Sequence, residues 1–128
     1  MAKKRAKILV VDDENFLRNF WETKLDPTVY EVIKAANGLQ GIAVTKARLP
    51  DLILLDIIMP GVSGFKVLQE LKKNPKTKGI PIIMLSNIGK EDEVKKALKL
   101  GAIDYIIKSD VIPQEVEEKI RQYLKKKI

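Results

Sequence analysis

Five short apolar runs, most of them ending at polar or charged residues, set the hydrophobic pattern of this chain. They span residues 7–11, 30–36, 52–55, 80–85 and 104–107. The run that ends at Asp56 is continuous and is followed by Pro60-Gly61, a pattern typical of a strand buried on both faces of a parallel sheet. We therefore expect this strand to lie centrally. The run over 30–36 alternates only in part, which predicts a position nearer an edge.

Segments with apolar residues three and four positions apart separate these runs and predict amphipathic helices. They begin near residues 16, 39, 64, 91 and 113 and end near residues 25, 47, 74, 100 and 124. Ser63 can cap the third helix, and Pro113 suits the first position of the last one. Strands that alternate with helices predict an α/β fold, a doubly wound five-stranded parallel sheet in a three-layer α/β/α sandwich. We expect one domain over residues 1–128, with a short basic N-terminal arm over residues 1–6.

The composition excludes several kinds of chemistry. The chain has no cysteine and no histidine, which excludes disulfides, thiol nucleophiles, serine–histidine dyads and histidine-ligated zinc. No run is long enough to span a membrane and no secretory signal is present, so we expect cytoplasmic residence without a membrane partner. The net charge of +7 would suit nucleic acid, but no aromatic residues alternate with the basic ones. A solvated basic surface is therefore favoured over direct nucleic-acid binding.

Functional groups stand at the ends of four of the runs: Asp12 and Asp13, Asp56, Ser86, and Lys108. Because parallel strands end at one edge of the sheet, we expect these groups to meet in one crevice. Clustered carboxylates repel one another, and Mg²⁺ is a cation that prefers such oxygen ligands. Together with the lysine, the site would be formally neutral and able to accept a phosphoryl group. An aspartate can itself be the nucleophile and form an acyl phosphate.

Four segments of the chain resemble the receiver domain of two-component response regulators, close to the single-domain CheY-like type. They are ILVVDDE (8–14), LILLDIIMPGVSG (52–64), IPIIMLS (80–86) and GAIDYIIKS (101–109), in the order and spacing of that family. The resemblance implies the strand order 2-1-3-4-5. It also implies a signalling module rather than an enzyme. A histidine kinase, a phosphotransfer protein or a small phosphodonor would phosphorylate it with Mg²⁺ and so change its binding to a partner protein.

The resemblance assigns roles to individual positions of this chain. These are the phospho-acceptor Asp56, the direct Mg²⁺ ligand Asp13, its water-linked neighbour Asp12, Ile58 with a main-chain carbonyl that completes the metal site, the switch hydroxyl Ser86, the phosphoryl-facing Lys108 and the switch aromatic Tyr105. The target protein would bind the face formed by the fourth helix, the fifth strand and the fifth helix. The resemblance implies a monomer, or a dimer once phosphorylated.

The chain departs from the family pattern at a few positions around the site. Ser109 stands where a proline with a cis bond is common, and a cis bond to serine would cost about 3 kcal/mol, which leaves the geometry of the following loop open. Asn87 replaces a small residue and could crowd or contact the phosphoryl group. The apolar Ile58 and Ile88 flank the site, and we expect them to exclude hydrolytic water and lengthen the phosphoryl lifetime.

Other interpretations of these residues stay open. The chain could be an interaction module that works without phosphorylation. A Mg²⁺-dependent aspartyl phosphatase is disfavoured because Ile58 stands where such enzymes usually carry a second acid. A flavin-binding protein is disfavoured because the acids at 12–14 would repel its phosphate. Tyr105 could be a half-buried strand aromatic, Ser86 a simple strand-end hydroxyl, and Lys108 a solvated strand terminus.

Overall fold

The computed structural model describes residues 4–87, 89–110 and 112–126, in which strands and helices alternate along the chain. The strands are β1 (Ala6–Val11), β2 (Tyr30–Ala35), β3 (Leu52–Asp56), β4 (Ile82–Ser86) and β5 (Asp104–Ile107). The helices are α1 (Asn15–Lys24), α2 (Gly38–Arg48), α3 (Gly64–Lys73), α4 (Glu91–Lys99) and α5 (Pro113–Lys126). The predicted alternation is therefore confirmed.

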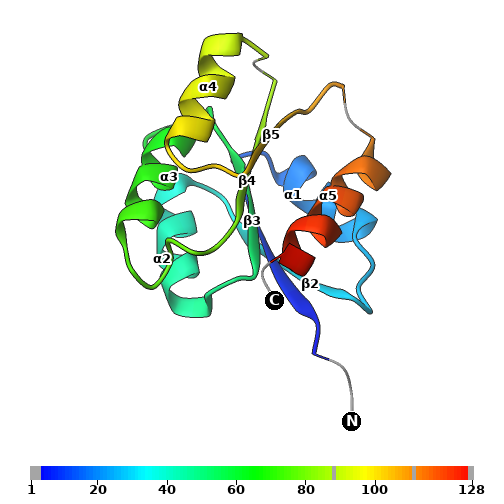
Figure 1. Ribbon diagram of the computed structural model, residues 1–128. Helices are drawn as coiled ribbons and strands as arrows, with labels where there is room; N and C mark the ends of the chain where they lie inside the picture. Colours follow the sequence, from blue (N-terminus) through cyan, green and yellow to red (C-terminus); the bar gives the residue numbers. More distant parts are fainter. Residues whose placement is uncertain (1–3, 88, 111, 127–128) are drawn as a thin grey trace.

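All strand pairs are parallel, and the sheet has the order β2-β1-β3-β4-β5, as the resemblance implied. Strand β3 lies at the centre and all its residues are buried, whereas β2 forms one edge. Figure 1 shows α2, α3 and α4 on one face of the sheet and α1 and α5 on the other. The doubly wound, three-layer fold is confirmed, and it brings the carboxyl ends of all strands to one edge.

Two hydrophobic cores, one on each face, hold the layers together. Alternate residues of β3 point to opposite faces: Ile53 and Leu55 join the core beneath α2, α3 and α4, and Leu52 and Leu54 join the core beneath α1 and α5. Each face is apolar because both are covered by helices, which explains the continuous apolar run in the sequence. Helices thus pack on both faces of the sheet, and the polar strand ends project from this packed core.

A few element boundaries differ from the sequence expectations. Strand β4 begins at Ile82 rather than residue 80, because Pro81 has no N–H and the N–H of Ile80 bonds instead to the carbonyl of Thr77 at 3.0 Å. The basic arm predicted over residues 1–6 ends before Ala6. Ala6 already belongs to β1, where its N–H donates to the carbonyl of Val29, and residues 1–3 lie outside the described residues.

The helix signals in the sequence are confirmed at two termini. The hydroxyl of Ser63 accepts a hydrogen bond from the N–H of Lys66 at the start of α3, and Pro113 is the first residue of α5. Among the residues that the structure describes, no helix combines the length and the apolar character needed to cross a membrane.

Candidate functional site

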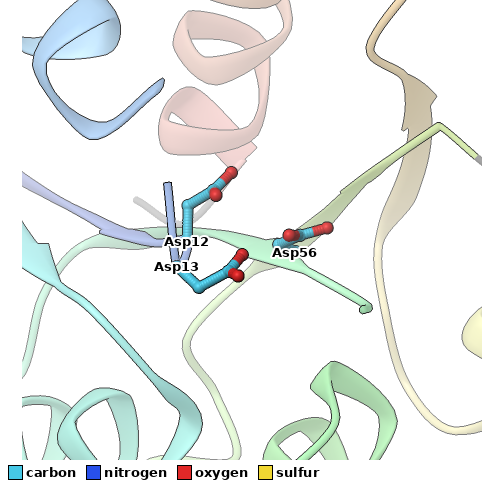
Figure 2. A group of neighbouring side chains, drawn as sticks. All are labelled: Asp12, Asp13 and Asp56. Atoms are coloured by element: carbon cyan, nitrogen blue, oxygen red, sulfur yellow. The ribbon is translucent and has the colours of Figure 1, made fainter. Parts of the chain in front are cut away.

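Three carboxylates gather at the carboxyl edge of the sheet, as the strand ends predicted. Asp12 and Asp13 follow β1, and Asp56 is the last residue of the central strand β3. Figure 2 shows the three side chains as neighbours at this edge of the sheet. Each offers an oxygen atom, and these oxygen atoms all lie within 4.8 Å of one another. The structure therefore brings together the acids that the sequence singled out.

The two neighbouring aspartates have different surroundings. Asp12 is buried, and its oxygens are already engaged: Oδ1 accepts from the N–H of Glu14 at 2.9 Å and Oδ2 accepts from the ammonium of Lys108 at 2.8 Å. Asp13 is exposed. The expected roles of Asp13 as a direct metal ligand and of Asp12 as an indirect one stay predictions. Glu14 stands at the N-cap of α1, without a side-chain capping bond.

Lys108 is the cation that faces this cluster among the described residues. Its Nζ lies 2.8 Å from Asp12 Oδ2 and 3.4 Å from Asp56 Oδ1, and its side chain is only 12% exposed. Burial lowers the pKa of Lys108, but the two carboxylates outweigh this and the net shift is upward. The side chain is therefore a held ammonium and not a solvated strand terminus.

The pKa of Asp56 is raised by its position in the cluster. Burial raises its pKa, Lys108 opposes that rise, and the neighbouring charges of Asp12 and Asp13 add to it, so that the pKa reaches about 6. One lysine thus does not balance three carboxylates. A divalent cation with oxygen ligands would relieve the excess negative charge, and the donor set fits Mg²⁺ in chemistry and spacing.

The loop between β3 and α3 borders the acids on one side. Ile57 and Met59 are buried in the core, and Ile58 between them exposes 62% of its surface. The loop turns at Gly61, which has a φ of 80° and so adopts a backbone conformation that favours glycine. Ile58 therefore stands two residues after Asp56 on an anchored loop. The metal-binding role of its main-chain carbonyl stays a prediction.

Ser86 and Tyr105 lie on the neighbouring strands β4 and β5, where Ser86 pairs with Ile107 and Tyr105 pairs with Met84. Ser86, the last residue of β4, is 1% exposed, and Tyr105 is half-buried against the core beneath α3 and α4. Burial raises the pKa of Tyr105, and a side-chain hydrogen bond with Ser86 works in the opposite direction. The family resemblance implied a switch role for both residues, which stays a prediction, and their side-chain contact depends on the register of β4 and β5.

The departures from the family pattern can be placed in part. The described residues contain no cis peptide bond, so the bond between Lys108 and Ser109 is trans. Asn87 is exposed just beyond the end of β4. Ile88 lies outside the described residues, and the expected exclusion of hydrolytic water by Ile58 and Ile88 stays a prediction.

Sequence reasoning missed Arg18, whose guanidinium donates to the main-chain carbonyl of Asp12 at 2.7 Å and to the side chain of Asn15 at 3.1 Å. Arg18 thereby holds the peptide between the two neighbouring aspartates from the end of the first turn of α1. The signal in the sequence is a basic residue six and five positions after Asp12 and Asp13, which becomes specific only once the direction of α1 is known.

Comparison with known proteins agrees with this geometry. Residues 8–124 match the model of the response regulator receiver domain family. The chain is 40% identical over 126 residues to the probable transcriptional regulator ycf27 of Pyropia yezoensis, covering 98% of this chain and 50% of that protein. It is 41% identical over 119 residues to the phosphate regulon transcriptional regulatory protein PhoB of Pseudomonas aeruginosa, covering 93% of this chain and 52% of that protein. The chain thus spans about half the length of the curated relatives it matches.

Solved structures with the same fold match most of the chain. A CheY-like response regulator receiver domain protein from Methanospirillum hungatei superposes with a TM-score of 0.89 at 29% identity, covering 97% of each chain. The chemotaxis protein CheY4 of Vibrio cholerae superposes with a TM-score of 0.86 at 26% identity, covering 93% of this chain and 98% of that one.

Proposed function

Because this chain belongs to the response regulator receiver domain family of two-component signalling, we propose that it is a switch that is phosphorylated on Asp56. The observation that carries the proposal is the cluster of Asp12, Asp13 and Asp56 beside Lys108. A rigid group of acids in excess of its one lysine is the arrangement that a divalent cation and a phosphoryl group would complete. We propose that the domain acts as a signalling module and not as an enzyme with an external substrate.

The proposed metal site is formed by Asp13 and Asp56, the main-chain carbonyl of Ile58 and, less directly, Asp12. Bound there, Mg²⁺ would neutralise carboxylate charge and polarise the incoming phosphoryl group. The exposure of Asp13 and the engagement of both oxygens of Asp12 support this division of roles. Lys108 already neutralises part of the charge before any phosphoryl group arrives.

In the proposed reaction, a carboxylate oxygen of Asp56 attacks phosphorus. The bond between phosphorus and the donor atom breaks, an acyl phosphate forms, and the donor keeps the bonding electron pair and takes up a proton. With the donor a phosphohistidine, the leaving group is the imidazole. The attacking oxygen must be ionised, and the pKa of about 6 for Asp56 makes the carboxylate the main form above that pH.

The switch that we propose starts at Ser86. Its hydroxyl and the Lys108 ammonium would each bind a phosphoryl oxygen, which would draw Ser86 away from the hydrogen bond it shares with Tyr105. Tyr105 would then reorient against α4. A local change of charge would thus alter the surface formed by α4, β5 and α5, where a target protein would bind.

The partners follow from this chemistry. A histidine kinase or a phosphotransfer protein would donate the phosphoryl group, and small phosphodonors would serve in its place. The names of the relatives include transcriptional regulators, which supports a role in a regulatory pathway. Phosphohistidine donors are made with ATP, so the proposal implies a cytoplasmic exchange. We propose a monomer that can dimerise when phosphorylated.

The direct test is the intact mass of the protein after incubation with acetyl phosphate. One added phosphoryl group that requires both Mg²⁺ and Asp56 supports the proposal, with Asp56→Asn as the matched control of similar size. An unchanged mass, together with no Mg²⁺-dependent binding of beryllofluoride, would contradict it and favour the interaction module that works without phosphorylation.

A further inference from the structure

Gly64, the first residue of α3, lies directly against the peptide that follows Asp56. An ideal Cβ built on Gly64 would lie 2.1 Å from the main-chain oxygen of Asp56 and 2.7 Å from the Cα of Ile57. Contacts this short are essentially never seen for real Cβ atoms, so one partner would have to move. Among the glycines of the described residues, Gly64 meets the closest obstacle, and that obstacle is main chain.

The same approach is fixed by a hydrogen bond. The N–H of Gly64 donates to the carbonyl of Ile57 at 2.7 Å, which closes the loop from β3 back onto the start of α3. A helix start can come this near to a strand end only where no side chain intervenes. The close approach therefore sets the position of the peptide between Asp56 and Ile57.

The surrounding structure leaves that peptide as the part that must shift. Ile57 and Met59 are 3% and 6% exposed, and both are packed in the core with Val67 and Leu68 of α3. A methyl group at Gly64 could be accommodated only by moving α3, which is anchored by these contacts, or by displacing the Asp56 main chain. Because packed interiors do not absorb such a volume freely, we expect the displacement to reach the carboxylate of Asp56.

We propose that Gly64 is a positioning residue of the phosphorylation site: the absence of its side chain sets the placement of the Asp56 carboxylate and the Ile58 carbonyl relative to Asp13. The proposal rests on the function proposed for Asp56. Mg²⁺ demands near-ideal octahedral geometry and tolerates little displacement of its ligands. Gly64 touches neither metal nor phosphoryl group, and acts through the main chain.

The test compares Gly64→Ala with two matched controls. Ser63→Ala removes the hydroxyl that caps the same helix end, through the bond to the Lys66 N–H, without adding any atom near Asp56. Gly79→Ala adds the same methyl group in the loop after α3, where nothing lies within 4 Å of the built Cβ. All proteins are measured in trimethylamine N-oxide, an osmolyte that favours folded states.

For each protein, Mg²⁺ affinity is measured by calorimetry, the metal-free amide shifts of residues 56–58 by NMR, stability by urea unfolding, and phosphorylation rate by intact mass with acetyl phosphate. We expect Gly64→Ala to weaken Mg²⁺ binding at least about 10-fold and to slow phosphorylation about 100-fold, the cost of a misplaced reacting group. We also expect it to move the amide signals of residues 56–58. Ser63→Ala should lower stability without these effects, and Gly79→Ala should change nothing.

Unchanged Mg²⁺ affinity and amide shifts in Gly64→Ala would overturn the proposal, as would equal losses in Ser63→Ala. Failure of Gly64→Ala to fold in the osmolyte would also overturn it, because the close approach would then be a requirement of the core and not of the site. A wild-type protein that cannot be phosphorylated would refute the function proposed for Asp56. The amide shifts and the metal affinity would still test the role of Gly64.

Discussion

Asp56 and Asp104 each face a lysine, yet their surroundings shift the pKa values of the two carboxyl groups in opposite directions. Asp56 shares its site with Asp12, Asp13 and Lys108, and its pKa is raised to about 6, first by burial and then by the neighbouring acids. Asp104, the first residue of β5, is also partly buried, which raises its pKa. Hydrogen bonds from donors around it outweigh that effect, so its pKa is lowered.

The donors around Asp104 explain the difference. Its Oδ2 accepts from Lys119 Nζ at 3.0 Å and from the Tyr123 hydroxyl at 2.7 Å, and its Oδ1 accepts from the N–H of Tyr105 at 2.7 Å. One acid with three donors is a saturated structural contact that ties α5 to β5. Three acids with one lysine form a cluster that still lacks positive charge. The balance of donors and acids, and not burial alone, separates a candidate site from a structural contact.

The largest difference is expected for metal binding. Asp13→Asn should weaken Mg²⁺ binding about 100-fold, because it removes a charged ligand from the cluster. Asp104→Asn should leave Mg²⁺ affinity unchanged, since Asp104 belongs to a separate, saturated contact. Isothermal titration of both variants checks this. Equal losses in the two variants would mean that the comparison is wrong.

A smaller effect is expected for stability, and here the variant with the loss should be the one at Asp104. Asp104→Asn should lower the free energy of unfolding by about 1–3 kcal/mol, because it weakens the charge-assisted bonds from Tyr123 and Lys119. Urea unfolding at neutral pH measures this loss. The Asp104 contribution is present above pH 3.8 and fades as pH falls through its lowered folded pKa. A loss that persisted at acidic pH would argue against it.

In the metal-free protein, replacing Asp56 should raise the free energy of unfolding, whereas replacing Asp104 lowers it. A folded pKa raised from 3.8 to about 6 means that the folded state binds more protons, so stability falls as pH rises between these values. Asp56→Asn should therefore stabilise the metal-free protein by about 1–2 kcal/mol at pH 8 after allowance for solvent screening. The gain should disappear near pH 4 and shrink when Mg²⁺ is added. If the free energies of unfolding of the wild type and Asp56→Asn differed by the same amount at every pH in this range, the raised pKa of Asp56 would be contradicted.

The smallest effect is expected for Lys119→Met. The Lys119 side chain is 41% exposed and Asp104 keeps its other two donors, so the free energy of unfolding should fall by less than about 1 kcal/mol.

The matched variant Lys108→Met leaves three carboxylates without their ammonium, and should raise the pKa of Asp56 further. NMR titration of the Asp56 carboxyl carbon in both variants measures its pKa. An unchanged pKa of Asp56 in Lys108→Met would show that the lysine does not act on this carboxyl group.

Much of this site could be predicted from the sequence because strand ends are visible there. Each of the runs before Asp12, Asp56 and Ser86 is apolar and continuous, so the polar residue that ends it marks the edge of the sheet. Parallel strands then bring these ends together without further information. The family resemblance supplied the strand order, which the pattern of residues does not determine.

Other features could not be predicted because they depend on packing between elements distant in sequence. The side chains of Lys119 and Tyr123 meet Asp104 only because of the rotation of α5 on the sheet. The hydrogen bond between Ser86 and Tyr105 depends on strand register. The crowding at Gly64 appears only when α3 is placed against the end of β3, since glycine in a sequence does not tell which neighbour excludes a side chain.

The most direct test of the central claim locates the phosphoryl group. The protein is phosphorylated with acetyl phosphate and Mg²⁺ and then reduced with borohydride, which converts an aspartyl phosphate to homoserine, and its peptides are sequenced by mass spectrometry. The account predicts homoserine at position 56, dependent on Mg²⁺ and absent from Asp56→Asn. Homoserine at Asp12, Asp13 or Asp104 instead, or at no aspartate, would contradict it.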